Sequence, residues 1–277
     1  MSTTDPQAAG EAVPPPRRPV SSAVAADPDA SAVGTPPAVL TIADVVRAAT
    51  VGLADAAFLP AWHRTGARAR RWMLREAGHP LDGPPVLLLP GVHESPRFLD
   101  PFAALTVACG RPPHAITALG RNVGRVMDTA ELAASYLERH DLTEVLVVAH
   151  SKGGLVGKQL MVWERTRWRI AGMIAVATPF SGSAFATRAP TRALRDFSPA
   201  DTTLLDLAGN RSANRDIVSV FPQFDPQIPG GSELEDAGAN VRLPVAGHFR
   251  VLAHPKLWRL VRSRVRGAPD HGVSGTR

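Results

Sequence analysis

A serine lies at the end of an apolar segment, in the stretch VLVVAHSKGG at positions 145–154. The hydroxyl of Ser151 is a weak nucleophile at neutral pH, so an enzyme that uses it must present it to a base and a substrate together. A sharp turn between a strand and a helix does this, provided that small residues stand two positions before and after the serine. Ala149 and Gly153 occupy those positions. The segment therefore predicts a strand, a tight turn with Ser151 at its tip, and a helix.

Two backbone N–H groups are candidates for stabilising the oxyanion that forms when a serine attacks a carbonyl. The N–H of Lys152 lies at the beginning of the predicted helix, where the helix dipole favours negative charge. The second group is expected in the loop after the first predicted strand, where Gly91 lets the backbone turn back and Val92 supplies the donor. The alternative interpretation of this loop is a simple strand-ending turn.

The sequence also offers a base and a carboxylate. Ligands of open parallel sheets bind outside the carboxyl ends of the strands, so residues that follow strands are the candidates. His248 directly follows the last predicted strand, and Asp225 follows the strand before it, in a loop that contains two prolines. The alternative for Asp225 is a turn aspartate. His150 adjoins the serine, but successive side chains of an extended segment point to opposite faces, so we expect its ring at the edge of the site.

The elements that must position these residues form an alternating pattern. Predicted strands cover residues 86–89, 115–119, 145–149, 173–177, 217–221 and 241–245. Predicted helices cover about 97–109, 127–140, 153–166 and 249–264, with one or two more between 39 and 80. This alternation predicts an α/β fold with a mostly parallel sheet of about six or more strands and helices on both faces. The long interval at about 181–214 is expected to form a small helical cap.

Length and composition set the domain organisation. The chain of 277 residues is long enough for one α/β domain and a tail. We expect residues 1–38, rich in Pro and Ala, to be disordered and residues 39–277 to form the domain. Cys109 is the single cysteine, which excludes an intramolecular disulfide. No secretory signal is visible, so a cytoplasmic location is expected.

Arginine accounts for most of the net charge of +6. Two groups stand out, at positions 64–75 and 259–266. They are interpreted as solvated helix faces, with attraction to an anionic surface or acidic substrate as the alternative. No nucleic-acid motif accompanies the charge, so nucleic acid is not an expected partner. The apolar segment 39–59 contains Asp44, Arg47 and Asp55, which argues against a transmembrane segment and for an amphipathic helix.

Together these features resemble the α/β-hydrolase superfamily and, within it, bacterial lipases and esterases. The similarity covers about residues 84–265 and is carried by the segments AHSKGG, PGV, ATPFSGS, FDPQIP and GHF. It implies Ser151 as nucleophile, Asp225 as acid, His248 as base, and the N–H groups of Val92 and Lys152 as oxyanion donors. Two features depart from the usual pattern: a proline precedes Gly91 where histidine is common, and the first small residue before the serine is alanine.

The expected activity is hydrolysis of a carboxylic ester through an acyl-enzyme intermediate. A small-molecule ester or lipid is the expected substrate, with a short or medium acyl chain, and no metal or organic cofactor is expected. The same residues could serve an acyltransferase, a thioesterase or an amidase. A non-catalytic module that binds a lipid or a protein partner is the alternative from another class. The sequence leaves the oligomeric state open.

Overall fold

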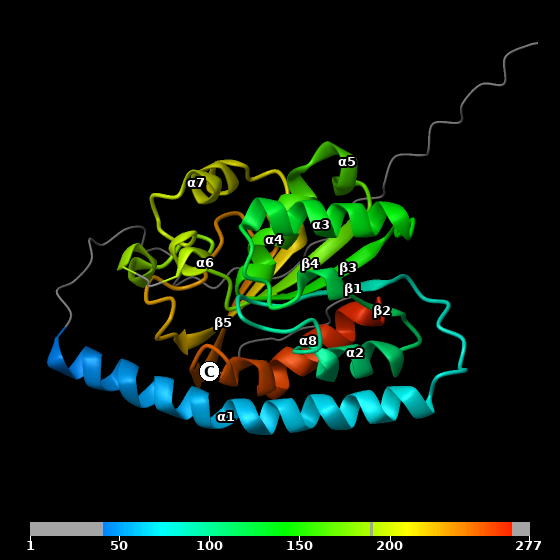
Figure 1. Ribbon diagram of the computed structural model, residues 1–277, viewed down its shortest axis with the longest axis horizontal. Helices are drawn as coiled ribbons and strands as arrows, with labels where there is room; N and C mark the ends of the chain where they lie inside the picture. The colour runs from blue at the N-terminus through cyan, green and yellow to red at the C-terminus, as the bar shows by residue number, and fades with distance from the viewer. Residues whose placement is uncertain (1–40, 189–190, 268–277) are drawn as a thin grey trace, which may run out of the picture.

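The computed structural model describes residues 41–188 and 191–267. The tail predicted at residues 1–38 lies outside the described residues. A six-stranded parallel sheet with the order β2-β1-β3-β4-β5-β6 forms the centre of the molecule (Figure 1). The strands are β1 (Val86–Leu89), β2 (Pro113–Ala115), β3 (Val145–His150), β4 (Ile170–Val176), β5 (Ile217–Phe224) and β6 (Ala239–Ala246). The predicted α/β fold with a parallel sheet is therefore confirmed.

The central strands are short runs of apolar residues. Every residue of β1 and β3 is buried, as are six of the seven in β4, because helices cover both faces of the sheet. The second predicted strand, 115–119, was placed too late in the chain. The strand ends at Ala115, and Thr117–Leu119 form a turn of 3₁₀ helix that closes on Gly120, whose φ is +55°.

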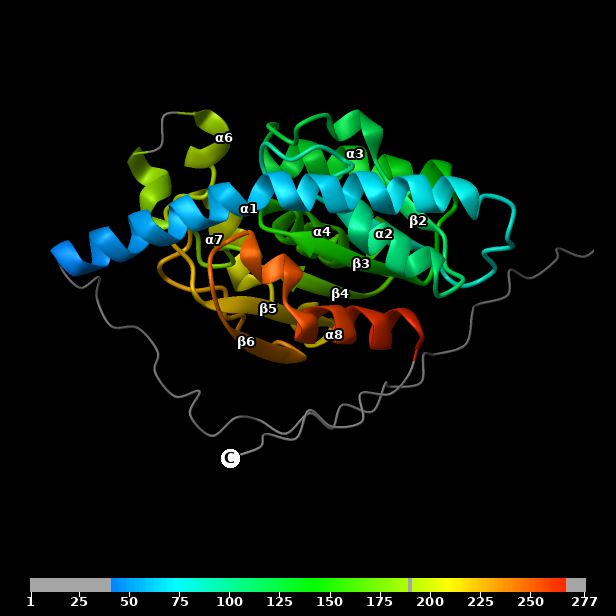
Figure 2. The same cartoon turned by 90° about the horizontal axis from the view of Figure 1, so that it is seen from below.

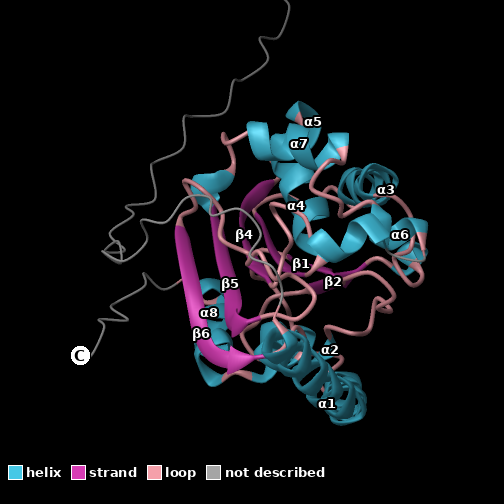
Figure 3. Ribbon diagram, turned by 90° about the vertical axis from the view of Figure 1, so that its left-hand side faces the viewer, coloured by secondary structure: helices cyan, strands magenta, loops and turns pink. Residues whose placement is uncertain are grey.

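Two helical layers enclose the sheet (Figures 2 and 3). One face packs against α3 (Val126–Arg139) and α4 (Lys152–Val162), and the short α5 (Glu164–Arg167) follows α4. The other face packs against α1 (Ile42–Arg75), α2 (Asp100–Val107) and α8 (Pro255–Val265). Apolar side chains from alternate strand positions form a separate core on each side of the sheet, and each core includes residues of the helices that cover that side.

Helical segments also connect the later strands. Between β4 and β5 lie a 3₁₀ turn (Ala184–Arg188), α6 (Arg192–Arg195) and α7 (Thr202–Gly209), and a 3₁₀ turn at Asn214–Asp216 precedes β5. Phe180, Phe197, Leu204 and Leu207 are buried in the core beneath α3 and α4, so these four side chains belong to the interior of the domain.

The final predicted helix, 249–264, is interrupted. Residues Arg250–Ala253 form a 3₁₀ turn, and α8 begins only at Pro255. His254 ends the turn because its ring Nδ1 accepts the N–H of Lys256 and caps α8, while Pro255 suits the first helical position.

One continuous helix, α1, occupies the region in which one or two helices were predicted. Thr41 and Asp44 form a capping box at its beginning, and it ends at Arg75, before the predicted breaker at 78–80. Trp62 attaches the helix to the domain, since its indole N–H donates to the carbonyl of Phe98 at 2.9 Å. Among the described residues no helix combines the length and apolar character needed to cross a bilayer.

Candidate active site

Ser151 lies in a strained turn between β3 and α4. Its φ of 51° and ψ of −122° are a backbone conformation that costs a residue with a side chain about 1–3 kcal/mol. Two hydrogen bonds hold the turn: the N–H of Ser151 donates to the carbonyl of Val176 at 2.8 Å, and the N–H of Gly154 donates to the carbonyl of Ser151 at 3.0 Å. The sequence predicted such a turn, and the strain presents the serine side chain at the end of the sheet.

Glycines allow the turn to pack against the end of β1. A Cβ atom on Gly153 would collide with the carbonyl of Leu89, and one on Gly91 would lie 3.0 Å from the Cβ of Ser151. The β1–α2 loop, residues 90–99, therefore runs directly beside the serine. Within the described residues, the backbone N–H groups of Val92 and Lys152 donate to no acceptor. Both donors are thus free to bind an oxygen atom of a ligand.

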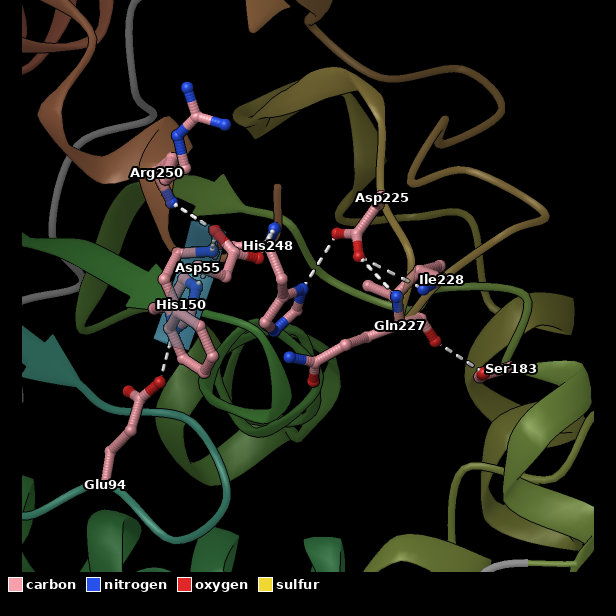
Figure 4. Close-up of polar contacts among 10 residues, drawn as sticks. Asp55, Glu94, His150, Ser183, Asp225, Gln227, Ile228, His248 and Arg250 are labelled. Atoms are coloured by element: carbon pink, nitrogen blue, oxygen red, sulfur yellow. Dashed lines mark hydrogen bonds and ion pairs between the residues drawn. The ribbon is translucent and has the colours of Figure 1, made fainter. Parts of the chain in front are cut away.

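Asp225 and His248 form a buried pair at the same edge of the sheet. The ring Nδ1 of His248 lies 2.8 Å from Oδ2 of Asp225 (Figure 4). The other carboxylate oxygen accepts the N–H groups of Gln227 at 2.8 Å and Ile228 at 3.2 Å. Asp225 therefore stabilises its own turn, as the turn interpretation predicts, and also binds the histidine.

Burial and charge act in opposite directions on this pair. Burial lowers the pKa of His248, but the charge and hydrogen bond of Asp225, with Glu94 and Asp55 further away, raise it above the ordinary value. For Asp225, burial raises the pKa, but His248 and the backbone N–H groups outweigh it, so the pKa lies below the usual range. Both shifts follow from the attraction between the carboxylate and the imidazole, which favours the charged form of each group.

The structure brings His248 and Asp225 into contact but leaves Ser151 without a direct bond to either. In the described part of the chain, the Ser151 hydroxyl and Nε2 of His248 have no hydrogen-bond partner. Ser151, Asp225 and His248 nevertheless follow β3, β5 and β6 at one edge of the sheet. Nε2 is therefore available as a proton acceptor on the side away from the carboxylate.

A second acid–imidazole pair lies beside the first. The ring Nδ1 of His150 is 2.6 Å from Oε1 of Glu94, and its Nε2 is 3.2 Å from the carbonyl oxygen of His248 (Figure 4). Because a carbonyl only accepts, Nε2 carries a proton and donates it. Oε2 of Glu94 accepts the N–H of Gly91 at 2.5 Å. The pair thus joins the β1–α2 loop to the backbone of His248, and His150 lies at the edge of the site as expected.

Asp55 reaches the same region from α1. Its carboxylate accepts three consecutive backbone N–H groups, from His248 at 2.6 Å, Phe249 at 3.3 Å and Arg250 at 3.1 Å (Figure 4). Burial raises the pKa of Asp55, and the three backbone hydrogen bonds oppose that increase. Since Gly247 has a φ of +121°, the chain turns sharply into this anchor. Through Asp55, helix α1 therefore fixes the position of the backbone at His248.

The side chain of Lys152 fixes a third loop. Its buried ammonium donates to the carbonyl and side-chain oxygens of Asn122 at 2.9 and 2.8 Å, to the carbonyl of Gly124 at 2.6 Å and to Thr129 at 3.2 Å. Asn122 in turn donates to the carbonyl of Pro90 at 2.7 Å. Burial lowers the pKa of Lys152 to about 8, although nearby carboxylates oppose the shift. The amine thereby links α4 to the beginning of the β1–α2 loop.

Sequence reasoning missed three contributors: Asp55, Glu94 and the Lys152 side chain. A signal existed for Asp55, because it shares a helical face with Phe58 and Trp62, where a charge is unusual. Glu94 lies in the loop that was already singled out for its oxyanion donor. In the described ranges, no cluster of three or more His, Cys, Asp or Glu side chains is arranged to hold a metal ion.

Comparison with known proteins rests on structure alone. No family model matches the chain, and no curated protein matches its sequence. The mature lipase BlEst2 of Bacillus licheniformis is similar at a TM-score of 0.50 and 15% identity, over 66% of this chain and 94% of that one. The lin2722 product of Listeria innocua is similar at a TM-score of 0.51 and 15% identity, over 69% and 96% of the two chains. The predicted resemblance is confirmed at the level of architecture: this chain has the α/β-hydrolase fold.

Proposed function

We propose that the protein is a serine hydrolase that cleaves carboxylic esters, with Ser151 as nucleophile, His248 as base and Asp225 as the supporting acid. One observation carries the proposal: a buried Asp225–His248 hydrogen bond of 2.8 Å lies at the sheet edge where Ser151 occupies a strained turn. Strained backbone at a residue with a reactive side chain is concentrated at functional sites. The free N–H groups of Val92 and Lys152 add a place for an oxyanion.

The proposed reaction has two steps. Nε2 of His248 takes the proton of Ser151 as the hydroxyl oxygen attacks the ester carbonyl, and the two backbone N–H groups stabilise the oxyanion. His248 then returns the proton to the leaving alcohol, so an acyl-serine remains. A water molecule, deprotonated by the same nitrogen, releases the acid and restores the serine. Asp225 holds Nδ1–H throughout, which keeps Nε2 available.

The missing bond between the serine and the histidine is compatible with this mechanism. Hydrogen bonds between catalytic groups are often long in unliganded enzymes and tighten when substrate binds. Rotation of the Ser151 side chain changes the position of its hydroxyl without moving the backbone. A short or medium acyl ester, rather than a long-chain triacylglycerol, is the proposed substrate.

Labelling with a fluorophosphonate tests the proposal directly, because such reagents modify activated serines. We expect the wild-type protein to be labelled and Ser151→Ala to remain unlabelled, whereas Ser181→Ala, an exposed serine after β4, serves as the matched control and labels normally. A series of p-nitrophenyl esters from acetate to palmitate then measures the acyl preference. Folded wild-type protein that takes up no label, or label that persists in Ser151→Ala, contradicts the proposal.

Other uses of the same residues give different products. An acyltransferase passes the acyl group to an added alcohol or amine in preference to water, and a thioesterase or amidase prefers the corresponding substrate. Product analysis with competing acceptors distinguishes these activities. A binding module would leave all esters intact and retain its cellular function in Ser151→Ala.

A further inference from the structure

The outward side of α1 carries large apolar side chains that are mostly exposed among the described residues. Five of the ten large apolar side chains that are most exposed in this part of the protein belong to this one helix. Four lie in its first half at helical spacing, on one side of the helix: Ile42 (85% exposed), Val45 (56%), Val46 (58%) and Leu53 (74%). We call this outward side of α1 the outer face, and we call these four residues its apolar half. Soluble domains rarely leave such a group unpaired.

The orientation of α1 is fixed by its opposite side. Asp55 and Trp62 are buried against the domain and bond to residues of two different loops. Arg47 lies over the ring of Phe224, with 4.2 Å between the guanidinium carbon and the ring centroid. The first turns of the helix extend past the sheet in Figure 1. The outer face therefore points away from the molecule and cannot be covered by a small rotation of the helix.

The second half of the same helix is basic. Arg64, Arg68, Arg71 and Arg75 are all exposed. The two acidic residues of α1 do not counter this charge, because Asp44 lies in the first turn at the other end of the helix and Asp55 is buried on the inner side. At 1.5 Å per residue, the 34 residues form a rod about 50 Å long with an apolar half and a cationic half.

We propose that the outer face of α1 docks this protein on an anionic phospholipid membrane, with the helix lying along the surface. Apolar side chains of an interfacial helix enter the boundary between headgroups and acyl chains, and arginines bind the lipid phosphates. One surface of this composition satisfies both halves of the helix at once. The net charge of +6 adds a long-range attraction between the protein and the anionic membrane.

A second copy of the chain matches this face less well. A two-fold interface pairs a surface with itself. Parallel helices would then place arginine against arginine, and antiparallel helices would place arginines against Ile42, Val45 and Val46. An anionic bilayer presents no such conflict, which is why the charge distribution favours it.

Cosedimentation of the full chain with vesicles tests the proposal. We expect binding to vesicles of phosphatidylcholine mixed with phosphatidylglycerol, weaker binding to phosphatidylcholine alone, and a loss of binding as salt increases. Val46→Glu/Leu53→Glu should reduce the partition coefficient at least about tenfold, because it places charge where apolar side chains would be buried. Arg64→Gln/Arg71→Gln should reduce it about 25-fold, since each arginine near an anionic surface contributes about fivefold.

The control is Leu132→Glu, which places one glutamate at an exposed leucine of α3 on the opposite side of the sheet. It should bind vesicles nearly as well as the wild type, and unchanged thermal melting shows that each variant is folded. The arginine pair tests the surface independently if the glutamate variant melts early. Wild-type protein that does not bind either vesicle overturns the proposal. So does a dimer, seen by light scattering, that only the α1 variants dissociate.

Vesicle cosedimentation measures lipid binding, and its result does not depend on whether the protein hydrolyses esters. A protein that binds vesicles but is not labelled by fluorophosphonate supports the docking surface and contradicts the proposed activity. The reverse result retains the activity and removes the docking surface.

Discussion

Asp55 offers a sharp test of how α1 supports the site. Its carboxylate accepts the N–H groups of His248, Phe249 and Arg250, and it is nearly fully buried. In Asp55→Asn one side-chain oxygen remains, so an N–H₂ group must face at least one backbone N–H. The substitution therefore removes a hydrogen bond to a charged group and creates a donor–donor contact in the same place.

The structure sets the size of the effect. A hydrogen bond to a charged group contributes about 1.5–3 kcal/mol, and an unpaired buried donor costs about 1–3 kcal/mol. The bond to His248 is the shortest of the three, at 2.6 Å. Because burial raises the pKa of Asp55, removing its charge also recovers part of a desolvation cost. We therefore expect a net loss of about 3 kcal/mol, which for a domain of this size lowers the melting temperature by about 6–12 °C.

The same variant should affect catalysis through position. Because the anchored N–H belongs to His248, its loss displaces the imidazole, so kcat for an ester substrate should fall more than KM changes. Calorimetry and steady-state kinetics measure the two effects, with the exposed Asp206→Asn as control. If Asp55→Asn has the same melting temperature and the same kcat as that control, α1 does not hold the site.

The other predictions concern the turn, the second acid–imidazole pair and pH. Gly153→Ala should cost about 3 kcal/mol or more in urea unfolding, because the new methyl group meets the carbonyl of Leu89. Glu94→Gln should cost about 3 kcal/mol and lower kcat, because the charged partner of His150 is lost from a buried site. Burial lowers the pKa of His248, but its carboxylate partner outweighs this and raises it. Since the neutral ring acts as base, kcat/KM should decline as pH falls, with a midpoint above 6.5.

Matched substitutions and clear outcomes accompany these predictions. Gly209→Ala has open space around the new methyl group, and Glu164→Gln changes an exposed glutamate, so both should be nearly neutral. A stable Gly153→Ala would show that the turn can move away from β1. A Glu94→Gln variant with normal stability and kcat would show that the second pair is unimportant. A midpoint at or below 6.5 would argue against the effect of Asp225 on His248.

Local sequence pattern predicted most of the sheet. Strands β1 and β3 are continuous apolar runs bounded by breakers, so their positions follow from the order of residue types. The turn at Ser151 was predictable for the same reason, because it requires only small residues at set positions. Asp225 and His248 followed from one topological rule, that parallel strands end at a common edge. The displaced second strand shows the limit, since three residues carry too little periodicity to locate it.

Contacts between distant segments could not be obtained in this way. Asp55 and His248 are 193 residues apart, and Glu94 and His150 are 56 apart. Neither pair has a local signature, because a buried carboxylate looks the same in sequence as an exposed one. The outer face of α1 was equally hidden, since apolar residues occur on both sides of the helix and only packing reveals which side is buried.

The sequence alone thus determined the order of elements, the strained serine turn and the three residues of the proposed chemistry, because each depends on short-range sterics or on where a strand ends. Tertiary structure decided which carboxylates and amines hold those residues in place. It also decided which face of α1 remains free, since a helix with two apolar sides can bury only the one that meets the sheet.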